Sequence, residues 1–399
     1  MFRTQEGKEI IMELKHIQGG KVCTGKTVRL SILYFFIYCP LGVVCPLIGQ
    51  YLSSIGFTGT QVGTITSLGT GTAIFAGMFW GQIYANSRHK RWLIGFMCFS
   101  AGLLGIAGTK TEVFVIYAVI YSAMYFFQGP IHGLCDSLVL SKEGNFSMIR
   151  SFGAVGYAAA VFAAGKYAEA TELKNIFYIY AAAYLVVIVM LLREEEPPFH
   201  RETGEKIRAS VLLRNRQYLK LLLCAFFIMG TNVANSTYFG YLFREGGGDL
   251  SGIGFAFLLM AGSEAPFMML LPKLARKFSS ETMILFAMVL SAIRFGFYST
   301  GPSSDMLLAT FFLQGMVNGV LLVELVKYVD RLVEPKYSGV AIAVYYAIGN
   351  SLSVIVCSFL GGIILDSAGV QWVYGFFSLY NVAAVVLYIL TGLYKAKAK

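Results

Sequence analysis

The sequence predicts an all-α membrane protein with 12 transmembrane helices arranged as two six-helix bundles. Hydrophobic residues make up 56% of the 399 residues, whereas charged residues make up only 14%. About twelve apolar stretches are each long enough to cross a bilayer. They form two groups of six around one charged segment, Arg193 to Lys220. Because they lack the period-two alternation of barrel strands, we expect helices.

The first six predicted helices precede the charged segment. Each is a run with few or no charges, and the runs cover roughly residues 28–53, 60–85, 91–109, 112–140, 147–167 and 175–192. The fifth contains small residues at Gly156, Ala160 and Ala164, whose spacing of four favours close helix packing. The acidic run that starts at Glu194 and ends in Pro197-Pro198 terminates the sixth helix, because proline cannot continue it.

Six further runs with few charges follow the charged segment. They predict helices at roughly 217–243, 252–274, 281–300, 304–330, 337–365 and 369–394. Between the groups, residues 205–217 fit either a basic amphipathic helix on the membrane surface or a solvated linker. The predicted organisation is therefore a cytoplasmic segment 1–27, a bundle 28–192, a linker 193–216, a bundle 217–394 and a tail 395–399.

Lysine and arginine gather on alternate connections between the predicted helices. The basic connections include residues 88–91, 273–277 and 327–336, whereas connections such as 55–60 and 366–369 are neutral or acidic. By the positive-inside rule, both termini face the cytoplasm of a plasma membrane, of the bacterial inner-membrane type. This bias accounts for the net charge of +10 without any nucleic-acid partner. The first 25 residues lack the apolar region of a cleavable signal peptide.

No motif of an enzyme or a metal site is present in the sequence. The seven cysteines show no paired spacing typical of metal sites or disulfides, and we expect them to pack as small residues. No His-Glu-x-x-His or Gly-x-Ser-x-Gly run occurs. We therefore expect a non-enzymatic, monomeric protein without cofactor or metal, whose partners are the lipid bilayer and a small-molecule substrate.

Ionisable residues within apolar runs are the candidate functional residues, because a charge at the bilayer centre costs at least about 2.5 kcal/mol. Glu264 lies midway along the eighth predicted helix, and Arg294 lies at a similar depth in the ninth. The two side chains are close enough in depth to pair. Such a pair would be either a static salt bridge or a carboxylate whose protonation is coupled to the substrate.

A second charged group is predicted near the cytoplasmic end of the fourth and fifth helices. His132 and Asp136 are four residues apart on one helix face, and Arg150 opens the next helix. These residues either bind substrate or extend to the membrane surface.

Amide side chains form a third group near mid-depth in the second bundle. Its members are Asn232, Asn235, Gln314, Asn318 and Asn350, which line a wet cavity or cross-link helices. Nearby, Glu324 and Lys327 are spaced three apart as a local ion pair.

Several segments resemble the major facilitator superfamily, and within it the branch of the lactose and phenylpropionate permeases. The run IRSFGAVGY, Ile149 to Tyr157, is similar to the fifth-helix signature of that branch. Ser263-Glu264-Ala265-Pro266 and Arg294-Phe295-Gly296 resemble its later helices. The resemblance implies that Arg150 binds a sugar and that Tyr157 stacks on its ring.

The chain also departs from that family at several sites. The loop that follows the second helix matches the family gating loop at Gly81, Lys90 and Arg91, but Ala85 replaces its aspartate. The resemblance places Asn232, Asn235 and Asn350 where the family has paired aspartates and a lysine on the seventh and eleventh helices. The coupling His and Glu of the tenth helix fall on Gln314 and Val317. Glu264 is therefore left as the leading protonation candidate, with Arg294 beside it.

The resemblance and the polar residues predict a secondary transporter that alternates between inward-open and outward-open states. We expect proton-coupled import of a small polar organic solute, with a sugar or oligosaccharide favoured and an aromatic carboxylate next. The alternatives are an efflux or uniport carrier of a drug, nucleoside or other metabolite, and a nutrient sensor that does not transport.

Overall fold

The computed structural model describes residues 25–395, apart from 141–145, 195, 197–211, 213 and 335–336. All regular structure in this part of the chain is helical. Eleven helical stretches are long and apolar enough to cross a membrane. The Ala- and Gly-rich helix α7 (Phe146–Ala170) packs between two of them, α2 and α10, and completes the set of twelve. The predicted all-helical membrane fold is confirmed.

The first predicted span is two helices rather than one. Pro46 lacks a backbone N–H and ends the preceding helix, so that the span is divided into α2 and α3. The elements of this half are α2 (Gly25–Val44), α3 (Ile48–Ser54), α4 (Gly59–Asn86), α5 (Lys90–Gly108), α6 (Phe114–Leu140), α7, η1 (Leu173–Asn175) and α8 (Ile176–Leu192).

The eleventh predicted span contains an irregular helix. Its middle part, η4, is a π-helix, a form that often marks functional sites. The elements of this half are α9 (Arg216–Glu245), α10 (Leu250–Leu274), α11 (Ser280–Tyr298), α12 (Ser304–Leu332), α13 (Ser338–Val344), η4 (Tyr345–Leu352), α14 (Ser353–Ala368), α15 (Val370–Leu390) and η5 (Leu393–Lys395). Gly369, with φ of +91°, makes the turn between α14 and α15.

Side-chain caps explain where several helices begin. Thr58 and Gln61 form a capping box at the start of α4, in which the Gln61 N–H donates to the Thr58 hydroxyl at 3.3 Å. Asn215 caps α9 and Asp249 caps α10 in the same manner. Ser279 caps α11 through the Thr282 N–H.

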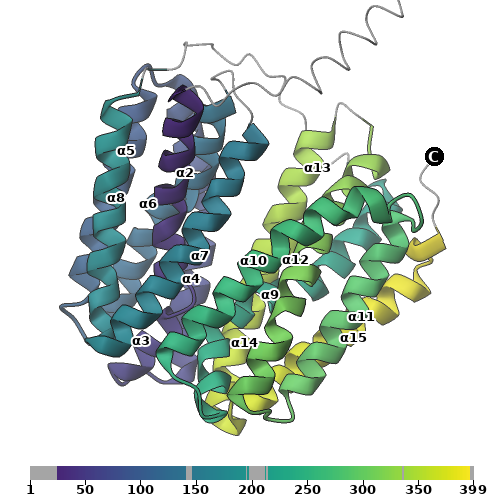
Figure 1. Ribbon diagram of the computed structural model, residues 1–399. Helices are drawn as coiled ribbons and strands as arrows, with labels where there is room; N and C mark the ends of the chain where they lie inside the picture. Colours follow the sequence, from purple (N-terminus) through teal and green to yellow (C-terminus); the bar gives the residue numbers. More distant parts are fainter. Residues whose placement is uncertain are drawn as a thin grey trace, which may run out of the picture.

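The helices form two bundles, α2 to α8 and α9 to α15 (Figure 1). We call the side where α2 begins and α8 ends the terminal side, and the side of α3 and the start of α4 the distal side. In Figure 1 the bundles converge at the distal side and diverge toward the terminal side.

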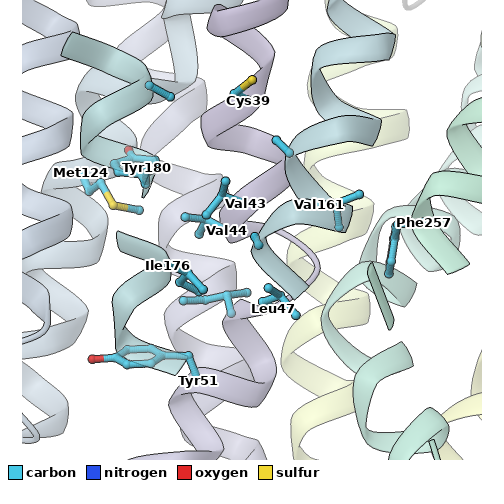
Figure 2. Close-up of a cluster of buried hydrophobic side chains, with 14 of the residues drawn as sticks. Cys39, Val43, Val44, Leu47, Tyr51, Met124, Val161, Ile176, Tyr180 and Phe257 are labelled. Atoms are coloured by element: carbon cyan, nitrogen blue, oxygen red, sulfur yellow. The ribbon is translucent and has the colours of Figure 1, made fainter. Parts of the chain in front are cut away.

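One buried hydrophobic cluster extends from the first bundle into the second. Figure 2 shows part of it, with Val44 and Leu47 beside Ile176, and Val161 of α7 near Phe257 of α10. A second cluster lies within α9 to α15. The first cluster is therefore shared by both bundles, whereas the second belongs to the second bundle alone.

Small residues allow the close approach of the bundles at the distal side. A Cβ on Gly254 of α10 would lie 2.8 Å from the Val161 carbonyl oxygen of α7. A Cβ on Gly63 of α4 would lie 3.1 Å from the Cα of Gly362 in α14. Neither position has room for a side chain, because the Ser358 carbonyl oxygen of α14 lies even closer to the Cβ position at Gly63, so glycine is required for this packing.

Some predictions fall outside the described residues. These are the segment before residue 25, most of the linker with its amphipathic helix, and the tail after residue 395.

Candidate functional site

The charged group of the first bundle is assembled at the terminal half of α6 and α7. Asp136 lies 3.7 Å from the Arg150 guanidinium and accepts a hydrogen bond from the Tyr34 hydroxyl at 2.5 Å. The Arg150 side chain is 58% exposed, whereas the Asp136 side chain is 23% exposed. His132 packs edge-on against Tyr38, with 4.6 Å between the ring centroids. Arg150 is therefore held by a carboxylate but still accessible to a ligand.

Tyr157 and Glu264 lie on opposite sides of the boundary between the bundles. Tyr157 on α7 and Glu264 on α10 are both half-buried, and these two helices pack against each other. A phenol group of the first bundle and a carboxyl group of the second therefore lie on helices that meet between the bundles.

The backbone of α10 at Glu264 packs against α12. A Cβ on Gly319 would lie 3.2 Å from the Glu264 carbonyl oxygen, so the two helices touch there. The Glu264 carboxylate is half-buried and, among the described residues, makes no ion pair. It is an ionisable group within the apolar part of a helix.

The predicted approach of Arg294 to Glu264 is wrong for this conformation. Arg294 is 2% exposed and donates a hydrogen bond of 3.3 Å to the side-chain oxygen of Asn232. Its guanidinium carbon lies 4.3 Å from the centre of the Phe295 ring. The arginine reaches from α11 toward α9, where the Asn232 amide accepts its hydrogen bond, while the stacking ring of Phe295 belongs to α11 itself. Its Nε and Nη1 atoms have no described hydrogen-bond partner.

The amides of α9 and α12 cross-link helices instead of lining an open surface. Gln314 donates to the backbone and side-chain oxygens of Asn232 at 3.3 and 3.5 Å, and to Asn318 at 3.2 Å. Asn235 accepts from the Tyr374 hydroxyl at 2.7 Å. Asn232, Asn235 and Gln314 are all buried. At these three positions, the structure favours the interpretation that the amides cross-link helices over the interpretation that they line a wet cavity.

The expected pairing of the seventh and eleventh helices through Asn232 and Asn350 is not found. Asn232 faces Arg294 and Ser291 of α11, whereas Asn350 lies in η4 with a buried side-chain oxygen that lacks a described partner. The π-helical turn displaces the side chains of η4 from their α-helical positions. Sequence alignment alone does not reveal this displacement.

The residues of the α4–α5 loop contact their own bundle. Arg91 binds Glu196 at 3.0 Å and the Glu194 carbonyl oxygen, both after α8. The Lys90 ammonium lies 5.0 Å from the centre of the Tyr84 ring. A Cβ on Gly81 would meet nothing within 4 Å, so no close approach explains this glycine. On α12, the predicted Glu324–Lys327 pair is confirmed at 2.8 Å.

Sequence reasoning missed several polar partners. Tyr34 bonds Asp136, and Asn381 links Thr231 to Ser291 through hydrogen bonds of 2.8 Å each. The sequence gives no signal for these residues, because tyrosine, serine and asparagine are common in apolar helices and carry no charge. In the described residues no group of His, Cys, Asp and Glu could hold a metal ion.

The known proteins that resemble this chain are transporters. Residues 27–376 match the model of the MFS_1 like family. Maltose permease of Geobacillus stearothermophilus is 33% identical over 92% of this chain and 94% of its own length. The uncharacterized transporter YwbF of Bacillus subtilis is 30% identical over 90% of this chain and 92% of its own. Among solved structures, the nucleoside transporter NupG superposes with a TM-score of 0.82 at 16% identity, over 92% of this chain and 99% of that one.

Proposed function

The chain belongs to the MFS_1 like family of permease-type transporters, and we propose that it imports a small neutral sugar together with a proton. It is a multi-pass membrane transporter and not an enzyme. The sugar and the proton are the proposed parts of this function, and each is supported by different residues.

The exposed ion pair of Arg150 and Asp136 is the observation that carries the sugar proposal. A sugar presents hydroxyl groups that both donate and accept hydrogen bonds. Arg150 offers several donors and Asp136 offers acceptors, while their charges cancel. Tyr157 adds an aromatic face near the same region. The similarity to a maltose permease supports the same substrate class.

An aromatic carboxylate is a weaker candidate than the sequence suggested. That hypothesis relied on two arginines to bind the anion. Arg294 is 2% exposed and engaged with Asn232, and the charge of Arg150 is balanced by Asp136. An anion would thus meet one arginine that is buried and one arginine whose charge is already balanced.

Glu264 supports proton coupling. Its carboxylate is half-buried within a membrane helix, where the charged form is costly without a partner. It also lies at the boundary between the bundles, so that a relative movement of α7 and α10 would change its surroundings. Uniport is the second candidate, because Gln314 and Val317 on α12 cannot titrate.

We propose that the terminal side faces the cytoplasm of a plasma membrane. Cations such as Arg29, Lys90 and Lys277 lie on this side, as the positive-inside rule requires.

The decisive experiment measures uptake by the purified protein in liposomes with an imposed proton gradient. Maltose, sucrose, a nucleoside and phenylpropionate are compared as radiolabelled substrates. We expect a sugar to accumulate only while the gradient is present. Accumulation of the nucleoside or the acid alone would contradict the sugar proposal.

The variant Glu264→Gln separates symport from uniport. Because glutamine cannot carry the proton, we expect sugar accumulation to be lost while sugar exchange across the membrane continues. Glu245→Gln, at the exposed distal end of α9, is the matched control and should accumulate normally. Gradient-driven accumulation by Glu264→Gln would favour a different proton carrier.

A further inference from the structure

Asp366 forms a contact between the bundles at the distal side. It lies in the last turn of α14, in the second bundle. Its two carboxylate oxygens accept hydrogen bonds from the backbone N–H groups of Gly59 and Thr60, at 2.6 and 2.7 Å. Gly59 and Thr60 are the first two residues of α4, in the first bundle. One carboxylate thus holds the start of a helix from the other bundle.

Glu169 makes the corresponding contact in the opposite direction. It lies in the last turn of α7, in the first bundle, and accepts from the backbone N–H of Leu250 at 2.9 Å. Leu250 is the first residue of α10, in the second bundle. Because α4 and α10 are the second membrane helices of their bundles, and α7 and α14 belong to the fifth, the two contacts occupy equivalent positions.

Electrostatics favours both contacts. The first N–H groups of a helix have no partner within the helix, and the helix dipole attracts negative charge there. The side chains of the cap residues of the same helices accept from the N–H of the third helix residue. Thr58 accepts from Gln61, and Asp249 accepts from Gly252. The earlier N–H groups are therefore left for the carboxylate of the other bundle.

The two contacts lie beside the glycine contacts that join the same helices. Gly63 of α4 packs on α14, and Gly254 of α10 packs on α7. If the bundles separated at the distal side, these four helices would move apart and both carboxylates would lose their partners to water. The hydrogen bonds would therefore form only while the distal side is closed.

We propose that Asp366 and Glu169 are positioning residues for transport, which together hold the distal side closed and set the balance between the two open states. The inference rests on the proposed alternation of the transporter. Both contacts must break when the distal side opens, and both form again when it closes. Their partners are backbone N–H groups, joined at Asp366 by the side chains of Thr58 and Thr60, so no titratable or charged side chain of the other bundle is needed.

The test measures the balance between the states directly, without transport. Spin-label distances are recorded for one distal pair, Lys110→Cys with Ser303→Cys, and one terminal pair, His89→Cys with Lys277→Cys. All four positions are exposed. The background carries Cys23→Ser, since the six other cysteines are buried or half-buried.

The variants Asp366→Asn, Glu169→Gln and the double variant are compared with the parent. Each amide keeps the size of the side chain but removes the charge. Since these bonds are near the surface, we expect each substitution to raise the ratio of distal-open to distal-closed protein about threefold to tenfold. In the double variant, the increase in the ratio should be the product of the two single increases. The two contacts share no residues, so their free-energy changes should add.

Asp249→Asn is the matched control. Asp249 also bonds the start of α10, but within its own bundle, and asparagine caps helices as well as aspartate does. We expect its distance distributions to match those of the parent within about twofold in population. Equal shifts in Asp249→Asn and Glu169→Gln would overturn the inference, because loosening of the helix end would then explain both.

The terminal pair distinguishes the other outcomes. In the double variant, the terminal distance must shorten as the distal distance lengthens. Longer distal distances with an unchanged terminal distance, or no change in either, would contradict the inference, whatever is found for sugar uptake. A shift of both pairs in a protein that transports no sugar would retain the inference and reject the sugar proposal.

Discussion

At the scale of single residues, the second bundle contains a buried cation that pairs with no anion among the described residues. Arg294 is stabilised by one amide oxygen of Asn232 and by the ring of Phe295. Two of its three nitrogen atoms lack a described partner. The sequence could identify Arg294 as a charge within a membrane helix. It could not identify the partners, because these depend on how α9 and α11 are rotated about their axes.

The first prediction concerns the amide that faces this arginine. In Asn232→Asp, a carboxylate would replace the amide 3.3 Å from the guanidinium and would form a buried ion pair. Asn235→Asp is the matched control, because Asn235 lies on the same helix but faces the Tyr374 hydroxyl. We expect Asn232→Asp to retain the parental stability and Asn235→Asp to lose at least about 2.5 kcal/mol.

Thermal unfolding of the two variants in detergent measures this difference. Equal losses would show that Arg294 does not interact with position 232 in solution. The same geometry predicts that Asn232→Asp will not rescue Asn350→Lys, because Asn232 is directed toward α11 and not toward η4.

The second prediction concerns the proposed sugar contact. Arg150→Lys keeps the charge but removes the forked donors that can bind Asp136 and a sugar hydroxyl together. We expect sugar affinity to fall about tenfold or more, since a charge-assisted hydrogen bond contributes about 1.5–3 kcal/mol. Titration calorimetry of the purified protein measures this change.

Arg276→Lys is the control for this experiment, because Arg276 is an exposed arginine of the α10–α11 connection. It should bind the sugar like the parent. Unchanged affinity in Arg150→Lys, with normal expression, would assign Arg150 to the membrane surface instead of the binding site.

At the scale of elements, most helix ends could be predicted from the sequence. Apolar runs and charged connections locate the helices, and the last one ends at Leu390 where residue 394 was expected. The irregular parts could not be predicted from hydropathy. Pro46 divides the first span, and the π-helix η4 interrupts the eleventh. A π-turn depends on packing against neighbouring helices, which a single run of residues does not reveal.

The third prediction concerns the ion pair that joins the start of α11 to the end of α12. Glu281 is buried and lies 3.3 Å from Arg331. Each charge is also at the helix end that its dipole favours. Glu281→Gln would remove the anion from Arg331, whose side chain is 35% exposed and can be solvated, so we expect a loss of about 1.5 kcal/mol in unfolding free energy.

Glu172→Gln is the comparison. Glu172 pairs with Lys174, but both side chains are at least half exposed, so the loss should stay below about 1 kcal/mol. Thermal unfolding of both variants under the same conditions tests this ranking. A larger effect of Glu172→Gln would mean that burial does not determine the strength of these pairs.

At the scale of the whole molecule, two bundles meet at the distal side through glycine contacts and through the carboxylates of Asp366 and Glu169. The sequence predicted the two bundles from the central charged segment and the repeated order of helices. It did not predict the contacts between them, because Asp366 and Glu169 read as ordinary acidic residues at helix ends. Their roles depend on helices that are distant in the sequence.

The last prediction concerns the orientation of the molecule in the membrane. On the terminal side, the connections α4–α5 and α10–α11 carry Arg88, Lys90, Lys273 and Lys277 among others, whereas the distal connections carry few cations. The energetic preference of cationic loops for the cytoplasmic face should therefore fix the terminal side inside the cell.

An impermeant maleimide applied to intact cells tests this orientation. In the Cys23→Ser background, Glu112→Cys on the distal side should react in intact cells, because Glu112 is exposed between α5 and α6. Lys277→Cys, which is equally exposed on the terminal side, should react only after the membrane is permeabilised. The two positions control for each other's reactivity. Labelling of Lys277→Cys in intact cells, with protection of Glu112→Cys, would reverse the orientation and would place the exposed Arg150 on the external side.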